Sequence, residues 1–267
     1  MTPRRALLAA PALLAPALLA PRPARAQVAL RGTPAQGALL VGSGAAGRRV
    51  ALDGAPVAVS PEGAFAIGFG RDHGPRAVLS VDGHPTEIAV APRAWDVQRI
   101  TGLPPEQVTP DAATLQRIAR EREALARARA AETPRGDFAR PFAWPAQGRI
   151  SGVYGSQRVL NGQPRQPHYG LDVAGPVGTP VLAAQSGRVA LAAEFHFFGR
   201  LLVLDHGHRV HTLYAHLSEL EAREGEEVAQ GARIARMGAT GRVTGPHLHF
   251  SLGLGPLWLD PRPLLPG

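Results

Sequence analysis

The sequence contains no cysteine and no lysine. Without cysteine, disulfides, thiolate metal sites and cysteine nucleophiles are excluded, so histidine, aspartate and glutamate remain as side chains for metal binding. All 29 basic residues are arginine, which excludes a lysine Schiff base, a phosphate-loop lysine and a lipoyl or biotinyl attachment site. An apolar fraction of 45% with 31 glycines and 26 prolines is typical of a globular chain built from short strands and turns.

The formal net charge of the whole chain is +8. Four of the arginines (Arg4, Arg5, Arg22 and Arg25) lie in an N-terminal segment that we expect to be removed, which leaves about +4. That charge suits an anionic neighbourhood such as a cell-wall polymer or a membrane surface, but it is too small to indicate nucleic-acid binding.

Residues 1–26 have the pattern of a secretory signal peptide. A basic start precedes the apolar stretch Ala6–Ala20, and Ala24-Arg25-Ala26 is a small-x-small cleavage sequence. We expect an exported protein of the periplasm or cell envelope, with no stable membrane span after cleavage, because the apolar stretch is short and proline-rich. A retained membrane anchor is the alternative. Arg4-Arg5 permits twin-arginine export as well as the general secretory route.

Residues 27–103 are predicted to form a small antiparallel β-domain, either a sandwich or a barrel. Apolar runs alternate with turn sequences such as Asp53-Gly54 and Asp82-Gly83. The expected strands are 38–41, 49–52, 57–59, 64–67, 77–81 and 87–90. His73 and His84 are interpreted as surface residues, and no catalytic pattern occurs in this domain.

Residues 104–136 are predicted to be a linker that contains an α-helix. Thr109 is a suitable N-cap, Pro110 fits the first turn, and residues 112–131 are strong helix formers. Leu115, Ile118 and Leu125 make a narrow apolar stripe, which favours a helix that lies across a surface or between domains.

Residues 137–267 are predicted to form an all-β domain, and they hold eight of the ten histidines. The expected strands are 150–154, 181–184, 188–191, 201–204, 210–214, 233–235 and 247–252, and residues 157–167 are expected to be a long polar loop. On a strand, His247 and His249 point to the same face and Leu248 points into a core. Both imidazoles could then bind a metal, or one could bind it while the other moves a proton.

His168 and Asp172 supply partners for this pair. The glycine between them lets the backbone bend, so that both could join His249 in a set of two histidines and one carboxylate. Three protein ligands with an open fourth position are typical of catalytic zinc. His216, which is expected at the end of a strand, could stand beside the metal with His247, as proton-handling or oxyanion-stabilising groups.

These motifs resemble the lysostaphin-type zinc metallopeptidases, the group that includes LytM. The match consists of His168-x-x-x-Asp172, Tyr214-Ala215-His216-Leu217 and His247-Leu248-His249-Phe250, with similar sequence between them, over roughly residues 142–263. The resemblance implies a fold related to the lipoyl/biotinyl half-barrel, and cleavage of the peptide stems of peptidoglycan with one Zn²⁺ per chain.

Residue by residue, the resemblance implies that His168, Asp172 and His249 bind zinc and that His216 and His247 are catalytic. Some relatives lack these residues and activate cell-wall amidases. This chain keeps all five, but an idle or autoinhibited activator remains the alternative function. Ser251 departs from the family, where glutamate is common, and we expect that change to affect only substrate contacts.

A carrier domain is a further alternative, because residues 227–238 resemble a lipoyl or biotinyl half-barrel. It is excluded by the absence of lysine. The predicted function is therefore an exported zinc endopeptidase that acts on peptidoglycan cross-links. The N-terminal β-domain is expected to serve either in substrate targeting or in autoinhibition.

Overall fold

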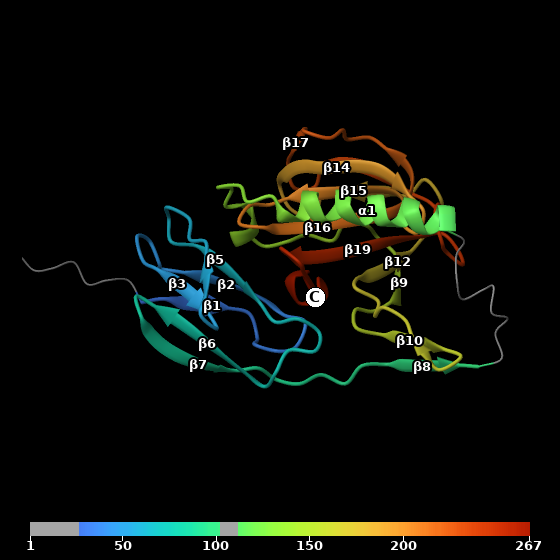
Figure 1. Cartoon of the computed structure of the whole chain (residues 1–267). Coiled ribbons are helices and arrows are strands. Elements are labelled where there is room, and N and C mark those ends of the chain that lie inside the picture. The colour runs from blue at the N-terminus through green and yellow to red at the C-terminus, as the bar shows by residue number, and fades with distance from the viewer. Residues whose placement is uncertain (1–26, 102–111) are drawn as a thin grey trace, which may run out of the picture.

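A computed structural model describes residues 27–101 and 112–267 of the chain (Figure 1). The predicted signal peptide and the predicted helix start at Thr109 and Pro110 lie outside these described residues. Within them the fold is mainly β, as predicted, with small N-terminal sheets, one long helix and a large C-terminal sheet. No helix in the described part of the chain is long and apolar enough to cross a membrane.

Seven N-terminal strands form two antiparallel sheets that pack face to face. The sheet β1-β2-β5 consists of β1 (Ala29–Arg31), β2 (Leu39–Ser43) and β5 (Phe65–Gly68). The sheet β4-β3-β6-β7 consists of β4 (Ala55–Val57), β3 (Val50–Leu52), β6 (Arg76–Val81) and β7 (His84–Ala89). Leu40 and Phe65 of the first sheet share a buried core with Val50 and Leu79 of the second, so the arrangement is a sandwich.

Within the sheet β1-β2-β5, strands β2 and β5 are buried on both faces. Side chains alternate across a strand, so Leu40 faces the sandwich core while Leu39 and Val41 face the other way. Leu39 and Val41 join the core of the C-terminal domain, which also contains Phe138 and Phe142. Burial on both faces explains why β2 is a continuous apolar run instead of an alternating one.

The segment that leaves the sandwich pairs with the C-terminal domain. Its strand β8 (Val97–Ile100) runs parallel to β10 (Gln157–Leu160), which in turn pairs with β11 (Gln163–Pro164). Residues 157–167, expected to be a loop, therefore contain a short hairpin that pairs along one edge with β8.

Helix α1 (Ala112–Ala130) lies across β14, β15 and β16 (Figure 1). Ile118 and Leu125 are buried, and Leu125 packs against Phe195 and Leu201 of the sheet. Leu115, the third member of the predicted apolar stripe, is instead 49% exposed.

The C-terminal sheet has ten strands, with the main order β17-β14-β15-β16-β19-β12-β9. Their bounds are β9 (Arg149–Gly152), β12 (Leu171–Ala174), β13 (Pro180–Leu182), β14 (Gly187–Phe195), β15 (Gly199–Asp205), β16 (Val210–Leu220), β17 (Glu227–Val228), β18 (Arg233–Met237), β19 (His247–Leu254) and β20 (Leu257–Leu259). Two 3₁₀ turns, η2 (Asp137–Ala139) and η3 (Arg262–Leu264), flank the domain. β16 and β19 are adjacent central strands, and most of their residues are buried.

Candidate metal centre and active site

Two of the predicted metal ligands lie on paired strands. Asp172 of β12 is directly opposite His249 of β19 in an antiparallel ladder. Leu248 is fully buried in the core on the other side of β19. His247 and His249 therefore share one face of the strand, as their spacing predicts.

His168 lies outside the regular strands, in the segment just before β12. The chain becomes a regular strand only after His168, at Leu171, so that Asp172 lies on β12 and His168 does not. Gly170 permits the close approach of this segment to β19: a Cβ atom there would lie 2.5 Å from Cε1 of His249.

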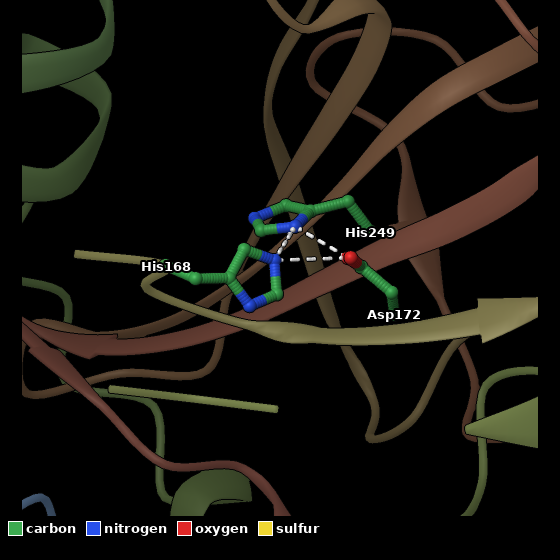
Figure 2. A group of neighbouring side chains, drawn as sticks. All are labelled: His168, Asp172 and His249. Atoms are coloured by element: carbon green, nitrogen blue, oxygen red, sulfur yellow. Dashed lines mark hydrogen bonds and ion pairs between the residues drawn. The ribbon is translucent and has the colours of Figure 1, made fainter. Parts of the chain in front are cut away.

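Three potential ligand atoms form a compact triangle (Figure 2). His168 Nε2 lies 3.0 Å from Asp172 Oδ1 and 3.0 Å from His249 Nδ1, and His249 Nδ1 lies 2.9 Å from the same carboxylate oxygen. The three residues could hold a metal ion. Ligands about 2.1 Å from a tetrahedral zinc lie roughly 3.4 Å from one another, so the triangle has nearly that size.

The donor chemistry of the triangle also fits a cation. His168 Nδ1 lies 3.0 Å from the carbonyl oxygen of Val153, which can only accept a hydrogen bond. In a neutral imidazole the proton is then on Nδ1, and the lone pair of Nε2 points at the other two ligand atoms. His249 Nε2 lies 2.9 Å from Ser251 Oγ, and a proton placed there leaves its Nδ1 lone pair pointing inward as well. A divalent ion relieves the repulsion among these lone pairs and the carboxylate.

His216 lies within β16, not at the end of a strand as predicted. Its φ of 64° is left-handed, and the register of β15 with β16 shifts beside it. Such an irregularity can redirect a side chain from a sheet. The backbone N–H of His216 donates to the carbonyl oxygen of Phe198 at 2.8 Å, and its Nδ1 lies 2.9 Å from the carbonyl oxygen of Thr240.

His247 lies beside both His216 and the candidate metal ligands. Its ring centroid is 4.7 Å from that of His216, and its Nε2 is 3.8 Å from Asp172 Oδ1. Its Nδ1 lies 2.9 Å from the carbonyl oxygen of Gly245. His168, His216 and His247 thus share one arrangement, in which a backbone carbonyl fixes the proton on Nδ1 and leaves Nε2 available.

Burial sets the electrostatics of the site. For His216, burial and then the neighbouring His249 lower the pKa to about 4, so that its imidazole is neutral at pH 7. Burial also lowers the pKa of His249. Burial alone would raise the pKa of the Asp172 carboxyl, but His168 and His249, when their rings are protonated and donate to it, outweigh burial and bring that pKa well below its usual range. The carboxylate is therefore ionised and able to bind a cation.

Ser251 is a site residue that the sequence did not reveal. The serine is 2% exposed, and its hydroxyl contacts the ring nitrogen of His249 that faces away from the ligand triangle. Ser251 follows His249 by two residues on the same strand, so both side chains share a face. This spacing could have indicated their contact. Ser251 thus contacts a candidate metal ligand, which the expectation of substrate contacts alone did not include.

Three other histidines of this domain are structural. His206 is fully buried between the carbonyl oxygen of Ser186 and the hydroxyl of Thr212. His208 and His211 are also buried, at 7% and 2% exposure.

Comparison with known proteins identifies the C-terminal domain. Residues 166–261 match Peptidase family M23. The peptidoglycan DD-endopeptidase ShyA of Vibrio cholerae is 44% identical over 86 residues, which cover 32% of this chain and 20% of ShyA. A Pseudomonas aeruginosa protein described as an NlpD/LppB lipoprotein homolog is 38% identical over 128 residues, which cover 47% of this chain and 40% of that protein. The matched segment is thus a minor part of either relative.

A solved structure extends the likeness beyond this segment. The crystal structure of an M23 peptidase from Pseudomonas aeruginosa aligns with a TM-score of 0.67 at 25% identity, covering 87% of this chain and 95% of that one. The alignment therefore reaches into the N-terminal sheets. Through its C-terminal domain, the chain belongs to the M23 peptidases of the LytM/lysostaphin type.

Proposed function

We propose that the chain is an exported zinc endopeptidase that hydrolyses peptide cross-links of peptidoglycan. The observation that carries this proposal is the convergence of five residues from three strands and one loop. His168, Asp172 and His249 form the ligand triangle, and His216 and His247 lie beside it. A protein that only bound peptidoglycan would need no such set.

The triangle is the proposed metal site, with His168 Nε2, Asp172 Oδ1 and His249 Nδ1 as ligands. Zinc bound there would supply a Lewis acid that polarises the scissile carbonyl and lowers the pKa of water. Only three protein ligands are within reach among the described residues, so a position stays open for water and substrate.

His216 is the proposed proton acceptor. It is neutral at pH 7 because burial lowers its pKa to about 4, and the Thr240 carbonyl holds the ring proton on Nδ1. Its Nε2 can therefore take a proton from the attacking water. The strained backbone at φ 64° fixes the ring in this direction.

His247 is the proposed partner in charge stabilisation and proton return. Its Nε2 lies 3.8 Å from Asp172 Oδ1, so its reactive nitrogen stands at the edge of the ligand triangle. From there it can stabilise the oxyanion of the tetrahedral intermediate and protonate the leaving amine. The two histidines thus divide the proton transfers that peptide hydrolysis requires.

Peptidoglycan is the proposed substrate, because the domain is similar to a peptidoglycan DD-endopeptidase and the chain carries a predicted export signal. The moderate positive charge of the chain suits an anionic cell-wall polymer.

Digestion of purified peptidoglycan tests the proposal. The full chain without its signal peptide is loaded with zinc, and the soluble muropeptides are analysed by mass spectrometry. His168→Ala and His247→Ala are compared with His84→Ala, which changes an exposed histidine of the N-terminal sandwich. We expect cross-linked muropeptides to be converted to monomers by wild type and His84→Ala only.

A parallel reaction with an added cell-wall amidase separates the alternative function. An activator would increase amidase products even in His247→Ala while releasing nothing alone. That result would replace the hydrolase assignment.

A further inference from the structure

The position of the proposed ligand His168 is not fixed by strand pairing, unlike the positions of Asp172 and His249. Asp172 and His249 are directly paired in the β12–β19 ladder, so their strands fix their relative position. His168 lies outside the ladder. Its place relative to Asp172 and His249 must therefore come from other contacts.

The loop at residues 153–156 supplies these contacts at three points. His168 donates its backbone N–H to the carbonyl oxygen of Ser156 at 2.7 Å, and accepts the N–H of Gly155 on its own carbonyl at 2.8 Å. The ring contributes the third contact, because Nδ1 lies 3.0 Å from the carbonyl oxygen of Val153. Any shift of this loop moves both the backbone and the ring of His168.

The loop is in turn held by Arg71 of the N-terminal sandwich and by Trp95, which follows the sandwich in the chain. Arg71, whose side chain is only 9% exposed, donates from Nε to the carbonyl oxygen of Gly155 at 2.8 Å. The ring of Trp95 covers Gly155 so closely that a Cβ atom there would lie 2.1 Å from it. Trp95 also meets the buried ring of Tyr154 edge to face, with centroids 5.7 Å apart.

Two arginines fix the Trp95 ring itself. The guanidinium of Arg71 lies 5.1 Å from the ring centroid and that of Arg93 lies 4.6 Å from it. Arg93 also forms an ion pair at 2.8 Å with Asp260, a buried residue of the C-terminal domain. Trp95 therefore stands in a fixed position against the loop.

We infer that Trp95 and Arg71 are positioning residues for the metal site, and that the N-terminal sandwich serves to hold His168 in place. This inference rests on the proposed zinc site. The sandwich packs against the C-terminal end of β19, where Gly68 adjoins Leu254 and Leu259, whereas His247 and His249 lie at the other end. The sandwich thus reaches the site through Arg71, and through Trp95 in the segment that follows β7, both of which contact the 153–156 loop.

Zinc affinity is the readout that distinguishes positioning from general stability. Residues that orient a metal ligand typically change affinity 10- to 100-fold when removed. We therefore expect Trp95→Ala and Arg71→Ala to raise the zinc Kd at least about 10-fold, measured by competition with a chromophoric chelator. Trp95→Phe, which keeps an aromatic ring over Gly155, should recover most of the affinity.

Trp144→Ala is the matched control. Trp144 also has an arginine over its ring, with Arg262 at 5.3 Å, and it packs on the core of the C-terminal domain. It does not contact the 153–156 loop in any described interaction. Its zinc Kd should stay within about twofold of wild type, even if the free energy of unfolding falls. The visible spectrum of the Co²⁺ form should change in Trp95→Ala and not in Trp144→Ala.

The possible results are distinguishable. If folded Trp95→Ala and Arg71→Ala bind zinc as tightly as wild type, the inference is wrong while the proposed function stands. If Trp95→Ala does not fold, Arg71→Ala decides alone. A wild-type chain that binds no zinc would overturn the proposed metal site together with this inference.

Discussion

His249 Nδ1 lies 2.9 Å from Asp172 Oδ1, although the two residues are 77 positions apart in the chain. The contact arises because β12 and β19 are antiparallel neighbours in which these residues are directly paired. His247, two residues earlier on β19, faces the same carboxylate oxygen from 3.8 Å. The Asp172 carboxylate thus lies next to the candidate ligand His249 and somewhat farther from the candidate catalytic residue His247.

The two histidines of β19 should have different phenotypes. We expect His249→Ala to lose bound zinc, because it removes one of the three proposed ligands. His247→Ala should keep about one zinc per chain and lose turnover, because its Nε2 lies outside the ligand triangle. Metal content measured by mass spectrometry, together with peptidoglycan digestion, checks both. Equal zinc loss in both variants would show that His247 is a ligand.

Ser251→Ala should weaken zinc binding. The serine hydroxyl lies 2.9 Å from His249 Nε2 and holds the ring whose other nitrogen faces the metal site. We expect the zinc Kd to rise roughly 10-fold, as is typical when a partner of a ligating histidine is removed. Chelator competition gives the value. Ser218→Ala, which changes a hydroxyl bonded to backbone carbonyls of β18, is the control, and an unchanged Kd in Ser251→Ala would refute the role.

Glu121 of α1 should help to hold the turn that positions His216. Its two carboxylate oxygens accept the backbone N–H of His196 at 3.0 and 2.9 Å, in the turn whose Phe198 carbonyl accepts the N–H of His216. We expect Glu121→Ala to lower kcat and to cost about 1–2 kcal/mol in the free energy of unfolding, with zinc content unchanged.

Glu123→Ala is the control for this prediction, because Glu123 is exposed on the same helix. Both variants are compared by steady-state kinetics and urea unfolding. A kcat that is equal in Glu121→Ala and Glu123→Ala would contradict the link from helix to site.

His206 should make stability depend on pH. Burial lowers its folded pKa from 6.5 to about 4. Asp205 and Asp137 raise this pKa and Arg135 lowers it, but burial has the largest effect. The unfolded chain then binds more protons between these values, so the free energy of unfolding should fall as pH drops from about 6.5 to 4. Its share is on the order of 3 kcal/mol.

Urea unfolding of the zinc-free chain at several pH values measures this effect. His206→Gln should be less stable than wild type at pH 7 and should show a shallower loss of stability over the same window. An identical pH slope in wild type and His206→Gln would contradict the assignment of a neutral buried imidazole.

Local sequence patterns were sufficient for most elements of the fold. The alternation in 77–81 and the helix-forming run in 112–131 predicted β6 and α1 closely, because each segment's own periodicity matches its structure. Seven strands were missed: β1, β8, β10, β11, β12, β17 and β20. β8 has its strand conformation because it pairs with β10, and that long-range pairing leaves little trace in four residues.

The sequence indicated which five residues lie together at the candidate site, but not the contacts that hold them there. The spacing of His247 and His249 is a local property of one strand, so it could be read directly. The position of His168 depends on contacts with the 153–156 loop and, through it, on Arg71 and Trp95. Such contacts join residues far apart in the chain and have no local pattern. The bulge that carries His216 likewise arises from the pairing of β15 with β16.

The most direct test of the central claim is hydrolysis of a purified, peptide-cross-linked muropeptide dimer in H₂¹⁸O. The zinc-loaded chain is the only protein present, so activation of another enzyme cannot contribute. We predict conversion of the dimer to two monomers, with one ¹⁸O in the new carboxyl group, by wild type and not by His247→Ala. An intact dimer after incubation with folded, zinc-containing wild type would contradict the assignment of this site as a peptidoglycan endopeptidase.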